Sequence, residues 1–338
     1  MTTIRDVARH AGVSFKTVSR VINGEPAVRK EMRERVQVAI RELGYQPTLA
    51  ARQLAGHKSY IISLIAPRVA ASYIARIMIA TAAECRAVGY HLNMEVIDVA
   101  HDRDPVESDD KVSFSVKPDA VILIPPFADH AGLIGQIESE GLPLVRIAAV
   151  GGGYGTRLAV NDENITVALI EHLLELGHRR IGIVAPASPK LASQTRVLGY
   201  RRALLAAGIT PDPALEVRGD FTFASGAAAA TQLMALPQRP TAIFAASDDM
   251  ALGVMAEAQR LGYRIPDDLA VAGFDDSPQS RLVYPALTTV FQPIAEMARA
   301  AVHAAIGREL ENFHVRHELR LRGSTTGDRS LCLSQADF

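Results

Sequence analysis

TIRDVARHAGVSFKTVSRVING, residues 3–24, predicts two short helices joined by a tight turn. Thr3 can cap the first helix, because a threonine oxygen accepts a hydrogen bond from a free N–H group of the first turn. Gly12 breaks that helix, since glycine readily adopts the left-handed backbone found at helix ends. Ser14 can cap a second helix over residues 15–22. Helix, tight turn and helix form a helix-turn-helix, a motif that places its second helix in the major groove of DNA.

A third helix is expected from about Lys30 to Leu43, ending at Gly44. Its apolar residues recur at helical spacing, so we expect them to face the first two helices. They are Met32, Val36, Ala39, Ile40 and Leu43.

The second helix has an apolar face and an outward face. Lys16 and Arg20 are four residues apart and therefore share the outward face. Lys and Arg can donate to guanine O6 and N7, whereas short polar side chains suit phosphate oxygens. An exposed helix with ordinary solvated charges is the alternative. The inward residues are Val18, Val21 and Ile22, and the remaining outward or polar ones are Phe15, Thr17, Ser19 and Asn23.

Charge is distributed unevenly along the 338 residues. Residues 1–58 hold 11 Lys and Arg against 5 Asp and Glu, whereas the rest holds 25 against 32. A basic head on an acidic body indicates a head that meets phosphate, although a solvated basic surface would look the same.

The pattern TIRDVAxxAGVSxxTVSRVING closely resembles the head of the LacI/GalR (lactose-repressor) family of bacterial transcription regulators. The segment ELGYQPTLAARQLAG, residues 42–56, continues the resemblance. One departure is Arg29, where many relatives carry Ser or Thr as the cap of the third helix. We expect DNA contacts from Thr3, Ser14, Phe15, Lys16, Thr17, Ser19, Arg20, Asn23 and Leu54.

PTLAARQLAG, residues 47–56, is too short to form a stable helix by itself, because isolated helices below about 12 residues are marginal in water. The resemblance implies a hinge helix that orders on cognate DNA. Two such helices, one from each subunit, would pack in the minor groove. Leu54 would then act as the apolar wedge that kinks the central base step. A plain linker with an incidental Leu is the alternative.

The remainder of the chain predicts an α/β body. Continuous apolar runs separated by amphipathic helical segments are typical of parallel sheets. More than seven such strands over about 260 residues indicate two lobes. The runs are residues 60–67, 90–98, 119–126, 143–148, 180–186, 214–221, 240–248 and 268–276.

The expected fold is therefore an all-α helix-turn-helix head plus an α/β body of two parallel-sheet lobes. The resemblance makes the body similar to periplasmic binding proteins. We expect a head over residues 1–47, a hinge over 48–58 and an effector-binding and dimerisation body over 59–338. The N-lobe would comprise about 59–159 and 290–325, and the C-lobe about 160–289.

Polar and aromatic residues collect where the predicted strands end, and open parallel sheets bind ligands at that edge. The resemblance implies that Arg196 grips sugar hydroxyls, that Phe221 stacks on the ring and that Asp275 accepts hydrogen bonds from hydroxyls. Ser247 stands where Asn is more frequent. Ala148 and Ala149 replace a frequent Asp-Arg pair, for which Arg146 would compensate, and Tyr73 would contribute from the N-lobe.

Each of these residues has an ordinary structural alternative. Phe221 could belong to the core, Asp275 could cap a turn, Arg146 could face solvent from a strand, and Arg196 could form a surface ion pair. Their convergence on one sheet edge favours binding.

The sequence contains no motif that indicates catalysis or a bound cofactor. Gly151–Gly155 fits no phosphate-binding spacing and reads as a flexible loop near a lobe crossing. There is no nucleophile elbow, no HExxH and no metal cluster, so we expect neither an enzyme nor a bound metal or cofactor. Cys85 and Cys332 form no disulfide framework, and no signal peptide or membrane span is evident. A cytoplasmic protein, associated with the nucleoid when bound to DNA, is expected.

These features predict a repressor of carbohydrate-utilisation genes, controlled by a sugar-like effector in the cleft between the lobes. A homodimer on a palindromic operator is expected, because the C-terminus lacks the leucine heptads with which related tetramers assemble. Two alternatives remain open. One is a sugar-binding or sugar-processing protein with an incidental basic head. The other is a body that binds a nucleobase or a partner protein.

Overall fold

The computed structural model describes residues 2–22, 28–45, 53, 58–68, 71–97, 111–186, 194–310, 313 and 315–327. The chain divides into two compact units, Met1–Ile61 with Val116–Asp119, and Ile62–Ser115 with Ala120–Phe338. No helix in the described ranges is both long and apolar enough to cross a membrane.

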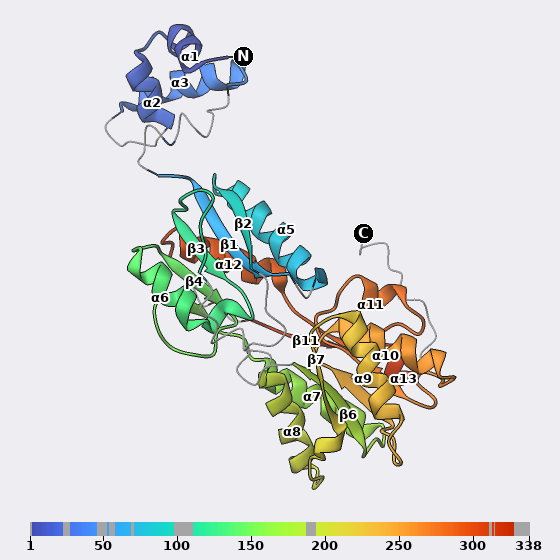
Figure 1. Cartoon of the computed structure of the whole chain (residues 1–338). Helices are drawn as coiled ribbons and strands as arrows, with labels where there is room; N and C mark the ends of the chain where they lie inside the picture. Colours follow the sequence, from blue (N-terminus) through green and yellow to red (C-terminus); the bar gives the residue numbers. More distant parts are fainter. Residues whose placement is uncertain are drawn as a thin grey trace. The chain divides into compact units, whose positions relative to one another are not determined.

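The first unit contains the three predicted helices, α1 (Ile4–Ala11), α2 (Phe15–Ile22) and α3 (Lys30–Glu42) (Figure 1). Thr3 and Asp6 form a reciprocal capping box at α1, and Gly12 closes that helix with a φ of 61°. Arg29 precedes α3 without a side-chain cap, as its departure from Ser or Thr suggested. Val7, Val18 and Val36 are fully buried between the helices.

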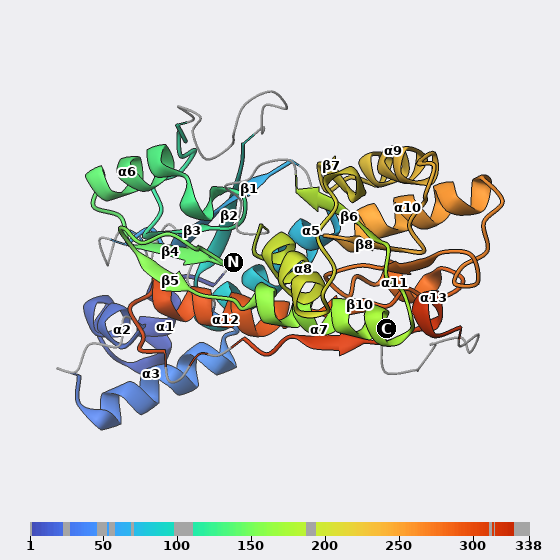
Figure 2. The ribbon, with the colours of Figure 1, turned by 90° about the horizontal axis from the view of Figure 1, so that it is seen from below.

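The first lobe of the second unit is a five-stranded sheet in the order β2-β1-β3-β4-β5. The helices α5 (Ala71–Ala87) and α12 (Ile294–Ala305) pack on one face, and α6 (Ala131–Ser139) packs on the other. Figure 2 shows α12 beside β4 and β5. The strands are β1 (Ile61–Pro67), β2 (His91–Ile97), β3 (Ala120–Leu123), β4 (Leu144–Ile147) and β5 (Thr156–Leu158).

The second lobe is a four-stranded parallel sheet in the order β7-β6-β8-β9. The helices α7 (Asp162–Glu175) and α8 (Gln194–Ala206) cover one face, and α9 (Phe223–Met234) and α10 (Asp248–Arg260) cover the other. The strands are β6 (Ile181–Pro186), β7 (Glu216–Gly219), β8 (Ala242–Ala245) and β9 (Ala270–Ala272).

The segment after residue 290 is divided between the two lobes. This differs from the expectation that residues 290–325 all belong to the N-lobe. The helix α12 packs on the first sheet. By contrast β11 (Glu318–Arg320) pairs antiparallel with β10 (Thr289–Phe291) and contacts α7. The short helix α13 (Gly323–Thr326) packs against β9, because Ser324 donates to the Val271 carbonyl oxygen (2.6 Å). The segment after α12 first packs on the core of the first lobe through Ile306, Leu310 and Val315, and from β11 onward it completes the second lobe.

The glycine run before residue 156 leads into a strand that the sequence analysis did not predict. Gly155 has a φ of 89°, and a Cβ atom there would lie 2.7 Å from the Leu144 carbonyl oxygen. Only glycine allows β5 to approach β4 this closely. The run thus connects β4 to β5 within the first lobe.

Candidate functional site

The outward face of α2 carries the side chains that we assigned to DNA. Val18 and Val21 are buried, whereas Phe15, Lys16 and Arg20 are exposed, Phe15 by 64%. Thr17 and Ser19 are half-buried at the sides. The outward face of α2 therefore presents one aromatic and two basic side chains.

Some of the predicted DNA contacts also hold the head together. The Ser14 hydroxyl accepts a hydrogen bond from the Thr17 N–H (3.1 Å) and therefore caps α2. The Thr3 hydroxyl lies 2.7 Å from a carboxylate oxygen of Asp6. Asn23 and Leu54 lie outside the described residues.

At the carboxyl end of the second sheet, an arginine from α8 meets two carboxylates. Arg196 donates from Nε to Asp162 (2.9 Å) and from Nη1 to the Ala246 carbonyl oxygen (2.5 Å). Its Nη1 also lies 4.0 Å from the Asp275 carboxylate, and its guanidinium stacks 3.7 Å from the centre of the Phe274 ring. These bonds fix a planar five-donor group in one orientation.

Asp275 is held from both lobes. Gln292 donates to its carboxylate (2.5 Å), and Arg76 on α5 of the first lobe donates to its backbone carbonyl oxygen (2.6 Å). Burial raises the pKa of the Asp275 carboxyl, while the positive charge of Arg196 opposes that rise. A buried carboxyl that can still accept hydrogen bonds suits a ligand with hydroxyl donors.

Tyr73 also lies on α5, three residues before Arg76, and packs partly on the core of the first lobe. Burial raises the pKa of its phenol, and the negative charges of Asp275 and Asp162 raise it further. The hydroxyl therefore stays protonated and can donate or accept a hydrogen bond. We call Tyr73, Asp162, Arg196, Asp275 and Gln292 the Arg196 cluster.

Unusual backbone geometry occurs after strands of both sheets, and most of it lies at the edge that carries the Arg196 cluster. Asp275 has a φ of 126° and Phe221 a φ of 66°, and Ala148 (56°) and Asp276 (49°) also lie shortly after strands. Residues other than glycine adopt such angles at a cost, and they concentrate at functional sites. Two of these four residues, Phe221 and Asp275, were predicted ligand contacts.

Phe221 and Ser247 lie at the same edge with less direct connections to the cluster. Phe221 is half-buried and packs against the core between the sheet, α9 and α10. It follows β7, which is three strand spacings, about 14 Å, from β9. The Ser247 hydroxyl accepts from the Met250 N–H (3.3 Å) and therefore caps α10.

Arg146 does not join the Arg196 cluster, contrary to our expectation. Its side chain is 1% exposed and faces the α6 side of the first sheet, where it pairs with Asp129 (3.3 Å). It also donates to the carbonyl oxygens of Ala128 and Gly151 (3.3 and 3.0 Å). Arg146 thus fastens the loops after β3 and β4 to each other, because a buried guanidinium must satisfy its donors locally.

Several residues of the cluster and its surroundings were missed from the sequence. Asp162 opens α7 and reads as an ordinary first-turn acid. His317 is almost fully buried 3.3 Å from Asp162, and burial lowers the pKa of its imidazole. Asp248 is fully buried and accepts from Thr289 (2.6 Å) and from the Ser277 N–H (2.7 Å). Burial raises the pKa of its carboxyl, as does the nearby charge of Asp275. Only Asp248, in the polar run after β8, carried a sequence signal.

Comparison with known proteins shows which families contain these two parts of the chain. Residues 3–48 match the family described as bacterial regulatory proteins, lacI family, and residues 170–325 match a periplasmic binding protein-like domain. The HTH-type transcriptional repressor CytR of Escherichia coli (strain K12) is 33% identical over 333 residues, which cover 96% of each chain. The chain belongs to the LacI family.

Solved structures of LacI-family regulators share both parts of the chain. The lac repressor dimer bound to operator and the anti-inducer ONPF has a TM-score of 0.74 at 27% identity, over 96% of this chain and 99% of that one. The complex of the transcriptional regulator CelR with cellobiose has a TM-score of 0.67 at 30% identity, over 96% and 100%. The predicted fold class and the predicted class of function, a DNA-binding transcriptional regulator, are therefore confirmed.

Proposed function

We propose that this LacI-family regulator is controlled by a small polyhydroxylated effector, a sugar or a sugar derivative, bound at the Arg196 cluster between the lobes. The observation that carries the proposal is the meeting of Arg196 and Asp275 at the carboxyl end of the second sheet, where Arg76 on α5 of the first lobe also donates to Asp275. In open parallel sheets this edge is the usual place for ligands.

The chemistry of the cluster suits hydroxyl groups. A sugar hydroxyl can donate to the Asp275 carboxylate and accept from the Arg196 guanidinium at the same time. The Tyr73 hydroxyl can serve either role. Phe221, at the far end of the edge, offers an aromatic surface for the apolar face of a sugar ring. The cellobiose bound to CelR, a regulator of the same fold at 30% identity, supports a saccharide.

At the DNA end, we propose that two copies of the chain bind a palindromic operator with Lys16 and Arg20 in the major groove. The hinge over 48–58 with its Leu54 wedge remains a prediction, because most of it lies outside the described residues. Such a regulator acts on the chromosome and hence in the cytoplasm, and we infer that it binds its effector without transforming it.

Thermal unfolding of the full chain with a panel of mono- and disaccharides tests the effector site. A ligand at 100 times its dissociation constant should add about 2.7 kcal/mol to the free energy of unfolding. Asp275→Asn should abolish this stabilisation, because it removes the acceptor charge. Arg202→Gln is the matched control, since Arg202 lies on α8 but pairs with Glu163 at the surface.

Equal stabilisation of native protein and Asp275→Asn by the same sugar would contradict the site assignment. Nucleosides in the panel test the competing ligand class, and a response to nucleosides alone would contradict the sugar. Chromatography of the ligand recovered from the protein checks that the protein does not transform it.

A further inference from the structure

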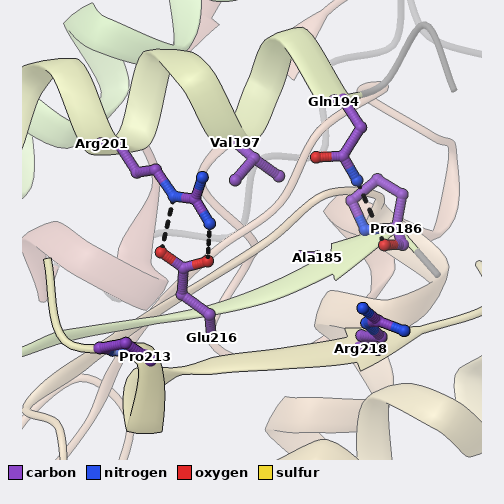
Figure 3. Close-up of a pocket in the computed structure, with 8 residues that line it drawn as sticks. All are labelled: Ala185, Pro186, Gln194, Val197, Arg201, Pro213, Glu216 and Arg218. Atoms are coloured by element: carbon purple, nitrogen blue, oxygen red, sulfur yellow. Dashed lines mark hydrogen bonds and ion pairs between the residues drawn. The ribbon is translucent and has the colours of Figure 1, made fainter. Parts of the chain in front are cut away.

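The second lobe contains a pocket that the proposed effector site does not use. It has a volume of about 310 Å³, which lies within the range of small-molecule sites. Figure 3 shows that it opens between α8 and the strands β6 and β7. Its lining residues are Ala185, Pro186, Gln194, Val197, Arg201, Pro213, Glu216 and Arg218.

The periodicities of one helix and one strand build the two walls. Gln194, Val197 and Arg201 follow the spacing i, i+3, i+7 and therefore lie along one face of α8. Glu216 and Arg218 are two residues apart on β7 and so point to the same side of the sheet. Because β7 is the edge strand, this side is not closed by a further strand.

Among the described residues that line the pocket, two arginines face one carboxylate. Arg201 and Glu216 form a two-point ion pair (2.8 and 2.5 Å), drawn as dashed lines in Figure 3. Arg218 pairs through its backbone with β6, but its side chain is exposed and its guanidinium has no ion pair or hydrogen bond with any described residue. Ala185, Pro186, Val197 and Pro213 supply apolar lining. An unpaired guanidinium beside an apolar floor is suited to an anionic group on an apolar body.

We propose that this pocket is a second small-molecule site, which binds a phosphomonoester or carboxylate through Arg218. It is separate from the Arg196 cluster, because Arg196 leaves α8 on the side of Asp162 and Ala246. The helix α8 is thus shared by two sites, one for hydroxyl groups and one for an anion. The regulator would then receive two chemical inputs in one lobe.

Calorimetric titration of the full chain with phenyl phosphate and with benzoate tests the pocket at constant ionic strength. We expect saturable binding with a dissociation constant below about 10 mM. Arg218→Gln should weaken that binding at least tenfold, since the charge-assisted hydrogen bonds are lost. Arg218→Lys should retain part of the affinity, because it keeps the charge without the two-point geometry. Comparing the dissociation constants of phenyl phosphate and benzoate shows which of the two anion classes the pocket prefers.

Two controls separate this site from others. Arg202→Gln removes an exposed arginine of the same helix outside the pocket. Asp275→Asn disables the proposed effector site. Both variants should bind the probes as the native protein does. Equal affinity of native protein and Arg218→Gln would place the binding elsewhere. Absence of saturable binding in the native protein would equally overturn the proposal. Loss of probe binding in Asp275→Asn alone would assign the probes to the Arg196 cluster.

Discussion

At the scale of single residues, function depends on side chains that are held by their neighbours. Arg196 points at the sheet edge because Asp162 and the Ala246 carbonyl oxygen bind its guanidinium. Asp275, whose backbone has a φ of 126°, places its carboxylate 4.0 Å from that guanidinium. Arg146 has the same chemistry as Arg196 but lies on the α6 side of the first sheet, so residue type alone does not decide which arginine reaches the carboxyl end of the second sheet.

The outward face of α2 leads to a prediction about DNA. Arg20→Ala should cost about 1–3 kcal/mol on the cognate operator and relax the base preference at one position, because a guanidinium that pairs with a guanine edge carries sequence information. Quantitative gel shifts on the operator, on single-base variants and on random DNA measure this. Arg41→Ala, an exposed arginine at the end of α3, controls for the loss of one positive charge. Equal losses by Arg20→Ala on operator and random DNA would show that Arg20 contacts only phosphate.

At the scale of elements, the pattern of apolar residues determines which helices and strands can be predicted from the sequence. The head helices and the strands in the eight apolar runs were predictable, because caps, glycine breaks and continuous apolar runs are local signals. The strands β5 and β10 escaped prediction because neither lies in a longer continuous apolar run, unlike β9, which has the same length. The partners of Arg196 and Asp275 escaped because Asp162 and Gln292 are distant from them in sequence.

The contact between α9 and α10 depends on two glycines and leads to the second prediction. A Cβ atom at Gly253 would overlap the carbonyl oxygen of Phe223, and one at Gly226 would overlap that of Met250. Gly253→Ala should therefore destabilise the chain by about 1–3 kcal/mol, because the two backbones must separate.

Denaturant unfolding compares this variant with Gly135→Ala, whose site in α6 is open. That control should gain about 0.5–1 kcal/mol from improved helix propensity. Equal stability of the two variants would show that α9 and α10 can move apart without cost.

At the scale of the second unit, the lobes are joined by more than the covalent chain. The chain passes between them after β5, after β10 and before β11. In addition, α5 of the first lobe donates two hydrogen bonds to the second: Ser72 to the Asp249 carboxylate (2.6 Å) and Arg76 to the Asp275 carbonyl oxygen (2.6 Å). Since Asp275 also belongs to the Arg196 cluster, the proposed effector site and the contact between the lobes share a residue.

This shared contact gives the third prediction. Ser72→Ala combined with Arg76→Gln removes the bonds from α5, so an effector bound at Asp275 should lose much of its influence on the first lobe and on the DNA-binding head that precedes it. Coupling between two sites is commonly about 1–3 kcal/mol, or roughly 5–150-fold in affinity. The measurement is operator affinity with and without a saturating sugar identified by the unfolding panel.

In the double variant the ratio of these affinities should approach one, while operator affinity without sugar stays that of the native protein. Ser139→Ala, which removes an exposed hydroxyl from α6, should leave the ratio unchanged. An unaltered ratio in the double variant would show that the connecting segments between the lobes transmit the signal without α5.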